Sequence, residues 1–372
     1  MKILHVCDST IGGTGSYLAE LLPYQAREYG RGNVALLMPT GHLPYLESDM
    51  TESDVQIVTF ARKNRLLGMV CLFFAYIYHL LRFRPDVVHA HSFGAGVVIR
   101  LLWPLTPARV VFCPHGWAFD MVAPRWRNLL VERIEWVLSL LCDRILMISG
   151  HEYERARDIG IAKSKLRIVR SGIAREAPAL APARWDDSRL KLLFVGRFDH
   201  QKGLDILLEA IEPLGDQVVL RTVGSSVVST GFETRPLPFV EHLGWLSRKD
   251  VTAQMRACDF LVVPSRWEGF GLVALEAMRL GIPVIASRVG GLREILDNGR
   301  FGPCFEPGDA AELRQRLIAL TSDKVAEWRH VAHQRFLDAY TSDRMQREID
   351  DLYQDATGGR FVPTAPSPVA PQ

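Results

Sequence analysis

The sequence predicts an α/β protein with two Rossmann-like domains, each built on a parallel sheet. A length of 372 residues exceeds what one compact core usually holds, which favours two domains. Apolar runs of strand length recur along the whole chain, and amphipathic segments separate them. Parallel strands covered on both faces by helices have this continuous apolar character, so both halves are expected to be doubly wound.

Twelve apolar runs have the length and composition of buried strands. In the first half they lie at 2–7, 33–39, 55–60, 87–91, 110–114, 144–149 and 166–169, and in the second half at 191–195, 218–223, 239–243, 260–264 and 283–287. Each is bounded by turn residues or by a segment with helical periodicity, as expected of alternating strands and helices.

A change in composition near the middle of the chain predicts the domain boundary. Residues 174–189 are rich in Ala and Pro without a clear period, so we expect a linker there. This places an N-terminal domain at 1–173 and a C-terminal domain at 190–340. A last helix is expected at 341–356, returning to the N-domain, and the Pro-rich residues 357–372 are expected to be disordered.

Composition and charge are those of an ordinary globular protein. The hydrophobic fraction is 48%, the charged fraction 23% and the net charge +2, which gives no support to a nucleic-acid binder. The six cysteines are scattered without a Cys-x-x-Cys pair, so they are expected to be buried reduced thiols of a cytosolic protein, with no zinc site. The first residues lack the long apolar region and cleavage site of a signal peptide.

Residues 66–81 form the longest apolar stretch of the chain, with 16 residues. A membrane span needs about 20, so the stretch is expected to be a buried or membrane-facing helix. Basic residues flank it on both sides and are suited to anionic headgroups. The alternatives are a core helix with solvated basic ends and a peripheral membrane contact. The flanking residues are Arg62, Lys63, Arg65, Arg82 and Arg84.

The strongest functional signal is the segment 260–278, in which a strand, a glycine-rich turn and a helix follow one another. Glu268 lies in the turn and Glu276 in the helix, and both carboxylates are expected at the carboxyl edge of the sheet, where open α/β folds bind ligands. Carboxylates accept hydrogen bonds from sugar hydroxyls. The backbone amides of Gly269, Phe270 and Gly271 are suited to phosphate. The alternative is a capping Glu268 and a solvated Glu276.

A second loop, within 192–203, carries Arg197 and Lys202 directly after a strand. Arg can bind a diphosphate through two parallel hydrogen bonds, and Lys adds a point charge. The alternative is a pair of ordinary loop cations. No Asp-x-Asp occurs in the chain, so we expect these cations and helix amides, rather than a metal, to neutralise phosphates.

The N-terminal half offers a glycine loop and two histidines at strand ends. Gly13 and Gly15 follow the first strand and open a helix, where backbone can approach a ligand closely. Leu18 and the lack of a later acidic residue weaken a nicotinamide-binding interpretation. His91 and His115 each close a strand and are suited to a sugar hydroxyl or phosphate. The alternative for both is a structural histidine.

These motifs together resemble retaining glycosyltransferases of family 4, which have the GT-B fold. The resemblance runs from about residue 1 to 351 and rests most on the Glu-x7-Glu motif of Glu268 and Glu276. Arg197 and Lys202 match the family's Arg-x4-Lys. The family fold implies two Rossmann-like domains that face each other across a cleft. The glycine loop, the segment 85–91 and the His115-Gly116 turn also match, whereas Ser171 stands where many members carry Asn.

The resemblance also implies a role for each matching residue. Four residues are expected to be catalytic, namely His115, Arg197, Lys202 and Glu268. Donor-binding residues are expected to be Gly12, Gly13, Arg197, Lys202, Glu268, Gly269, Phe270, Gly271 and Glu276, with Glu276 on the ribose. The acceptor side is expected to include Gly13, Thr14, His91 and Trp117.

The implied activity is transfer of a hexose-type sugar from a nucleotide-diphosphate donor, such as UDP- or GDP-hexose, to a hydroxyl. The acceptor would be a glycan or a polyprenyl-linked saccharide in exopolysaccharide, capsule or lipopolysaccharide synthesis. Such an enzyme would need no cofactor or metal and would work in the cytoplasm, with a possible peripheral contact at the inner face of the membrane. The alternatives are an epimerase or phosphorylase on the same fold and a non-catalytic nucleotide-binding subunit.

Overall fold

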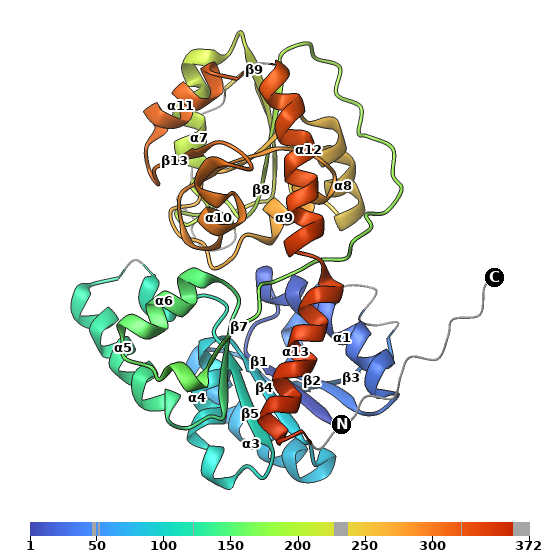
Figure 1. Ribbon diagram of the computed structural model, residues 1–372, viewed down its shortest axis with the longest axis vertical. Helices are drawn as coiled ribbons and strands as arrows, with labels where there is room; N and C mark the ends of the chain where they lie inside the picture. The colour runs from blue at the N-terminus through green and yellow to red at the C-terminus, as the bar shows by residue number, and fades with distance from the viewer. Residues whose placement is uncertain (47–49, 51–52, 122, 227–236, 321, 360–372) are drawn as a thin grey trace, which may run out of the picture. The chain divides into compact units, whose positions relative to one another are not determined.

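The computed structural model divides the chain into two compact units (Figure 1). It describes residues 1–46, 50, 53–121, 123–226, 237–320 and 322–359. Unit 1 consists of Met1–Ser171 with Ser342–Gln372, and unit 2 of Gly172–Thr341. Each unit contains one parallel sheet, which confirms the predicted class of two Rossmann-like α/β domains.

Unit 1 is built on a seven-stranded sheet of order β3-β2-β1-β4-β5-β6-β7, with every described pairing parallel. The strand order reverses between β1 and β4, which is the switch point where doubly wound folds bind ligands. The strands are β1 (Ile3–Cys7), β2 (Val34–Pro39), β3 (Gln56–Phe60), β4 (Val87–His91), β5 (Arg109–Cys113), β6 (Arg144–Met147) and β7 (Leu166–Ile168).

The helices of unit 1 cover both faces of this sheet. Crossovers between parallel strands are right-handed, so the helices that lead from β3 to β4, β4 to β5 and β5 to β6 lie on one face, and α1 lies on the other. The α-helices are α1 (Gly13–Tyr29), α3 (Arg65–Phe83), α4 (Ser92–Leu101), α5 (Arg125–Ser139) and α6 (Gly150–Asp158). Short 3-10 helices are η1 (Thr40–Tyr45), η2 (Trp103–Leu105), η3 (Ala118–Asp120) and η4 (Lys163–Lys165).

A buried ion pair joins two of these helices. Arg100 of α4 and Glu135 of α5 are 0% and 1% exposed and lie 2.7 Å apart between Nη1 and Oε2. A second bond of 3.2 Å makes the pair bidentate. The guanidinium also lies 3.8 Å from the centre of the Phe112 ring. The buried residues of α5 are Glu135, Leu138 and Ser139, and Glu135 joins this helix to α4.

Unit 2 repeats the topology with a six-stranded parallel sheet of order β10-β9-β8-β11-β12-β13. Its switch point lies between β8 and β11. The strands are β8 (Leu190–Val195), β9 (Val218–Val223), β10 (Val240–His242), β11 (Phe260–Val263), β12 (Val284–Ser287) and β13 (Cys304–Phe305). The sequence did not predict β13, because two residues are too few to show a strand pattern.

Helices cover this second sheet as well, and the residues expected to form a linker pack on unit 2. The helices are α7 (Leu204–Ile211), η5 (Glu212–Leu214), α8 (Arg248–Ala257), α9 (Leu272–Arg279), α10 (Gly290–Ile295), η6 (Asp297–Gly299), α11 (Ala310–Ile318) and α12 (Ser322–Ala339). Within 174–189, the N–H of Ala183 donates to the carbonyl of Ala253 over 2.9 Å. The guanidinium of Arg221 lies 4.4 Å from the Trp185 ring.

The last helix, α13 (Ser342–Thr357), belongs to unit 1 and runs beside α1 (Figure 1). Gln346 donates to the carbonyl of Glu20 over 2.8 Å, and Tyr29 donates to Asp350 over 2.5 Å. This helix therefore covers the α1 face of the sheet. The tail expected to be disordered lies, from residue 360 onward, outside the described residues.

The predicted burial of the cysteines is confirmed at five of the six positions. All six are free, and five are buried, while Cys71 in α3 is partly exposed. Burial raises the pKa of the Cys142 and Cys304 thiols to about 11, so both are protonated.

Candidate functional site

The loops after β8 and β11, at the switch point of unit 2, bring together three of the predicted residues. Arg197 and Lys202 lie on the β8 loop, and Glu268 lies on the β11 loop. The Nζ atom of Lys202 lies 2.5 Å from Oε2 of Glu268, and Ser265 donates to the same carboxylate oxygen over 3.2 Å. The two side chains are only 20% and 11% exposed, so this is a half-enclosed ion pair rather than a solvated surface contact.

Arg197 is held by two residues of its own loop. Its Nη2 atom lies 3.1 Å from Asp199 Oδ2 and 3.0 Å from Gln201 Oε1. Asp199 also accepts a hydrogen bond of 3.0 Å from the backbone N–H of Lys202, which closes the turn. Sequence reasoning missed Asp199, although its place two residues after Arg197 at a strand end was a signal.

Glycines allow the loops around Glu268 to approach closely. A Cβ on Gly203 would lie 2.1 Å from the carbonyl oxygen of Pro264, and one on Gly290 would lie 1.8 Å from that of Glu268. Both glycines have positive φ, 66° and 45°. Any larger residue at either position would therefore push the β8 or β12 loop away from the Glu268 turn.

The turn after Glu268 presents backbone amides. The N–H groups of Gly269, Phe270 and Gly271 donate to no acceptor in the described part of the chain. Gly271 caps α9 with φ 101°, so the amides lie at a helix N-terminus, which attracts anions. The Phe270 side chain is buried and lies 5.9 Å from the Tyr340 ring. Its backbone amide, through which the donor contact is expected, is therefore the part of Phe270 that is available to a ligand.

Glu276 lies in α9 with its side chain 18% exposed. Its Oε1 atom is 3.8 Å from Nη2 of Arg248, the first residue of α8. This carboxylate therefore lies beside a cation and remains partly accessible, as a hydroxyl acceptor requires.

In unit 1, the two predicted histidines belong to a line of buried side chains. Nε2 of His5 lies 2.7 Å from Gln25 Oε1, Nδ1 of His5 lies 2.9 Å from Nε2 of His91, and Nδ1 of His91 lies 2.9 Å from Nε2 of His115. Burial lowers the pKa of His5 to about 4 and of His115 to about 3, so these rings are neutral. With the Gln25 oxygen as acceptor, each neutral ring donates toward Gln25, which leaves Nδ1 of His115 as an acceptor.

This arrangement corrects the expected role of His91. The side chain is fully buried, and both its ring nitrogens are occupied by His5 and His115. His91 therefore supports His115 and does not itself reach an acceptor. His5 and Gln25 were missed, because neither follows a strand end and only the fold brings them to His91.

The buried Glu152 of α6 holds the backbone of the His115-Gly116 turn in place. Residues 115 and 116 have φ of 54° and 103°. Glu152 accepts hydrogen bonds from the N–H of Gly116 over 2.6 Å and of Ile148 over 2.9 Å, and burial raises its pKa to about 8. Trp117 is 2% exposed and donates to the Glu152 carbonyl over 2.9 Å. Trp117 is thus a core residue under the turn, which corrects its expected contact with the acceptor.

The glycine loop after β1 is open on the side of Gly12 and Gly13. A Cβ on either would meet no atom within 4 Å, whereas one on Gly15 would lie 2.0 Å from the Thr10 carbonyl oxygen. Gly12 caps α1 with φ 87°, and Thr14 lies in the first turn of that helix. Asp8, which sequence reasoning missed, accepts from the Ser92 hydroxyl and connects the β1 and β4 loops.

Two groups of side chains in unit 1 have the composition of metal ligands. The ligand atoms of His5, His89 and His91 lie within 4.8 Å of one another, as do those of His91, Cys113 and His115. A metal there would have to break the hydrogen bonds that join the histidines, and burial keeps the Cys113 thiol protonated by raising its pKa. These residues fit a neutral hydrogen-bonded line better than a metal centre.

Two family profiles together match most of the chain. The family described as "Glycosyltransferase Family 4" matches residues 11–177, and that described as "Glycosyl transferases group 1" matches residues 189–323. The first covers the glycine loop and the histidines of unit 1. The second covers Arg197, Lys202, Glu268 and Glu276.

Known sequences with similar length point the same way. A 41.2 kDa protein in the cps region of Klebsiella pneumoniae is 30% identical over 83% of this chain and 87% of its own length. An α-1,3-galactosyltransferase of Escherichia coli, which acts from UDP-Gal on α-D-GlcNAc-diphosphoundecaprenol, is 25% identical over 75% of this chain and 78% of its own.

Solved structures show the fold. HepE from Anabaena, crystallised with UDP and glucose, has a TM-score of 0.75 at 20% identity and covers 95% of this chain and 99% of its own. Sucrose-phosphate synthase from Thermosynechococcus elongatus has a TM-score of 0.76 at 18% identity, over 96% and 100% of the two chains. The GT-B fold implied by the sequence motifs is therefore confirmed.

Proposed function

This chain belongs to glycosyltransferase family 4, and we propose that it transfers a hexose from UDP to a lipid-linked saccharide with retention of configuration. The observation that carries the proposal is the convergence of Arg197, Lys202, Glu268 and three free backbone amides at the switch point of unit 2. Cations and helix amides together provide a site for a diphosphate without requiring a metal.

The similar proteins support the choice of donor and acceptor. HepE has been crystallised with UDP-glucose, and the Escherichia coli relative acts from UDP-Gal on a diphosphoundecaprenol-linked sugar. The Klebsiella relative is encoded in a cps region. We therefore place the reaction in the synthesis of a surface polysaccharide, in the cytoplasm at the inner face of the membrane.

The proposed reaction requires no protein nucleophile. The bond between the anomeric carbon and the diphosphate oxygen breaks, and the acceptor oxygen bonds to the same face of that carbon. The acceptor proton passes to the departing diphosphate oxygen. Arg197, Lys202 and the amides of residues 269–271 would stabilise the negative charge that grows on the diphosphate. Glu268 would orient the hexose, Glu276 would bind the ribose, and His115 would accept a hydrogen bond from a sugar hydroxyl.

The test is a screen of UDP-, GDP- and ADP-hexoses for binding, hydrolysis and transfer to a polyprenyl-diphosphate sugar. We expect a UDP-hexose to bind and to be transferred, with the α-anomeric configuration of the donor kept in the product. Activity should persist in EDTA. Transfer that is lost in EDTA and restored by manganese would contradict binding of the diphosphate without a metal. An epimerised or phosphorolysed product would contradict a transferase activity.

Replacing Arg197 with Ala tests whether this side chain binds the donor diphosphate. Loss of one charge-stabilising donor lowers turnover by about 10²–10³. Arg300→Ala serves as the control, because the Arg300 side chain is 75% exposed and lies away from the β8 and β11 loops. If both variants have the same turnover, Arg197 does not contact the donor.

A further inference from the structure

Helix α5 of unit 1 has its apolar side outward. The helix buries Glu135, Leu138 and Ser139, whereas its largest apolar side chains are exposed. Trp126 is 69% exposed, although a Trp of a globular core is normally well covered. The exposed apolar residues of α5 are Trp126, Leu129, Leu130, Ile134, Trp136, Val137 and Leu140. Their spacing of three and four residues places most of them on one side of the helix.

Helix α3 presents a second exposed apolar stripe. It is long and apolar enough to cross a membrane, but Leu72, Tyr76 and Leu80 are buried against the sheet, so it is part of the unit 1 fold. The opposite side of the helix is uncovered, and Leu66 is 80% exposed. The stripe consists of Leu66, Leu67, Val70, Phe74, Tyr78 and Leu81.

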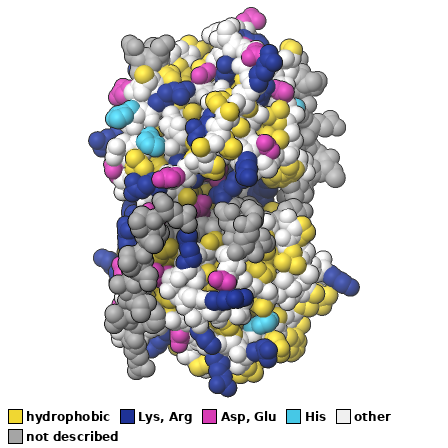
Figure 2. Space-filling view, turned by 90° about the vertical axis from the view of Figure 1, so that its right-hand side faces the viewer, with side chains coloured by type: hydrophobic (Ala, Val, Ile, Leu, Met, Phe, Trp, Pro, Cys, Tyr) yellow, Lys and Arg dark blue, Asp and Glu magenta, His cyan; other side chains and the backbone are white. Residues whose placement is uncertain are grey.

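Helix α3 connects β3 to β4 and helix α5 connects β5 to β6, and both connections run in the same direction across the sheet. Because such crossovers are right-handed, the two helices lie on the same face of the unit 1 sheet. Helix α4 lies between them and contacts both. Figure 2 views the molecule from the side away from α5, and it too shows hydrophobic side chains of unit 1 beside Lys and Arg side chains. We refer to the exposed stripes of α3 and α5 together as the apolar face.

Exposed cations lie at the ends of α3 and within α5. Six exposed Lys and Arg side chains form no ion pair with any carboxylate that the structure describes. They are Lys63, Arg82, Arg84, Arg125, Arg127 and Arg133. Helix α3 contains no acidic residue. In α5, Glu135 is paired with Arg100, and Glu132 lies 3.5 Å from Arg155. The charge available at this face is therefore positive.

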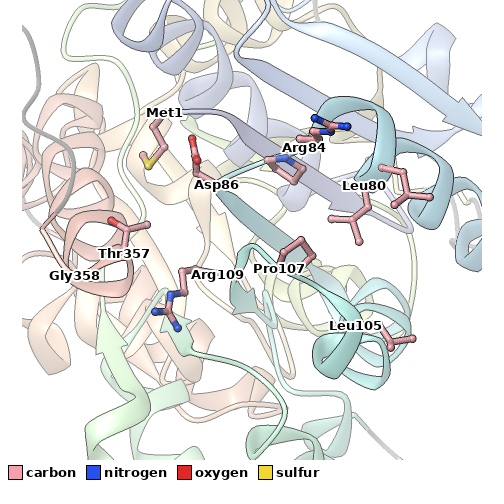
Figure 3. A pocket seen from close by; sticks show the side chains of 11 residues that line it. Met1, Leu80, Arg84, Asp86, Leu105, Pro107, Arg109, Thr357 and Gly358 are labelled. Carbon is pink, nitrogen blue, oxygen red and sulfur yellow. The ribbon is translucent and has the colours of Figure 1, made fainter.

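A hollow at the end of α3 places apolar and basic side chains together. It has a volume of about 1090 Å³ and lies at the amino ends of β1, β4 and β5. Leu80, Leu105 and Pro107 lie on one side, and Asp86, Arg109 and Met1 on the other (Figure 3). Leu105 is 74% exposed. Arg109 is paired with Asp143 at 3.0 Å, whereas Arg84 on the rim has no carboxylate partner among the described residues.

We propose that α3 and α5 together form a docking surface for an anionic phospholipid bilayer. Exposed Trp and Tyr beside Leu and Phe suit the boundary between headgroups and acyl chains, and the exposed cations suit anionic headgroups. A second copy of the chain fits less well, because a symmetric pairing of this face would oppose basic residues with basic residues. This docking surface rests on the proposed function, in which the acceptor is lipid-linked. It adds which surface of the chain meets the lipid.

The test is flotation of the full chain with vesicles of phosphatidylcholine, with and without phosphatidylglycerol. We expect flotation only with phosphatidylglycerol and its loss in the α5 variant Trp126→Glu/Leu130→Glu and in the α3 variant Phe74→Glu. Arg127→Ala should weaken partitioning by about fivefold, as for one surface charge. Trp245→Glu is the matched control, because Trp245 is an exposed Trp of unit 2 (61%). It should float as the wild type does.

Two further measurements keep the result interpretable. The substituted side chains are exposed, so the variants should melt at the wild-type temperature and still bind UDP. They should lose transfer only to an acceptor embedded in vesicles, which separates this inference from the proposed function. Wild-type protein that fails to float, or an α5 variant that floats like wild type, would overturn the proposal. A wild-type dimer by light scattering that the α5 variant converts to monomer, without flotation, would assign the face to a second copy.

Discussion

Replacing Glu268 with Gln should separate nucleotide affinity from sugar transfer. In the structure, the two cations Arg197 and Lys202 are each paired with a carboxylate, at 3.1 Å to Asp199 and 2.5 Å to Glu268. The loop pair is therefore close to electrically neutral before a donor arrives. A diphosphate must compete with Glu268 for the Lys202 ammonium, so the carboxylate that orients the hexose opposes binding of the phosphates.

The size of this opposition follows from Coulomb's law. If the Glu268 carboxylate and the diphosphate are treated as two unit negative charges about 6 Å apart, they repel each other by about 3 kcal/mol at an effective dielectric constant of about 20. Glu268 and Lys202 are 11% and 20% exposed, so partial screening reduces the figure to about 1–2 kcal/mol. Each 1.4 kcal/mol is tenfold in affinity. Glu268→Gln should therefore bind UDP about tenfold more tightly, while turnover falls by about 10² because the hexose is no longer oriented.

Calorimetry with UDP and a transfer assay with the UDP-hexose measure the two effects. Lys202→Ala should weaken UDP binding, and adding Glu268→Gln to that variant should recover part of the loss. Lys249→Ala is a matched control, because Lys249 is an exposed cation on α8. If Glu268→Gln weakens UDP binding as much as Lys202→Ala does, the carboxylate supports the phosphates instead of competing with them. Competition between Glu268 and the phosphates for Lys202 would then be excluded.

Three other perturbations test the ribose contact, the helix pairing and the buried histidines. Glu276→Gln should lower UDP affinity by about tenfold in calorimetry, because the amide loses charge-assisted bonds to ribose hydroxyls; unchanged affinity would exclude this role. Glu135→Ala leaves Arg100 buried without its partner, so denaturant unfolding should show a loss of about 3–5 kcal/mol, whereas Arg100→Met/Glu135→Leu should stay near wild type. His5 has its pKa lowered to about 4 in the fold; its stabilising effect is present above the unfolded value of about 6.5 and is lost as the pH falls through that value toward 4. Unfolding free energy should fall by about 2 kcal/mol less between pH 7 and 5 in His5→Gln than in wild type, and equal losses would refute the neutral buried ring.

The sequence by itself determined the fold class and the position of the motifs along it. Strands of parallel sheets are buried on both faces, so their apolar character is visible as continuous runs such as 87–91 and 260–264. Arg197 and Glu268 could be placed at the carboxyl end of the sheet because each lies in the loop after such a run, at 191–195 and 260–264.

The pairing of charges and the hydrogen-bonded line were decided by tertiary structure. His5 lies in the interior of β1 and Gln25 lies in α1. Nothing in the sequence around either residue marks it as part of the hydrogen-bonded line. Glu152 looks like a polar residue of a helix start, yet the fold buries it behind the His115-Gly116 turn. These contacts join segments far apart in the chain, and local patterns carry no information about such contacts.

The sequence also did not determine which side of a helix is buried. The apolar positions of α5 have the spacing of a core face, and from the sequence alone they would be assigned to the interior. The structure instead buries Glu135 against Arg100 and leaves Trp126 and Leu130 exposed. Periodicity identifies which residues share one side of a helix, but only the packing of neighbouring elements decides whether that side meets the core or the surroundings.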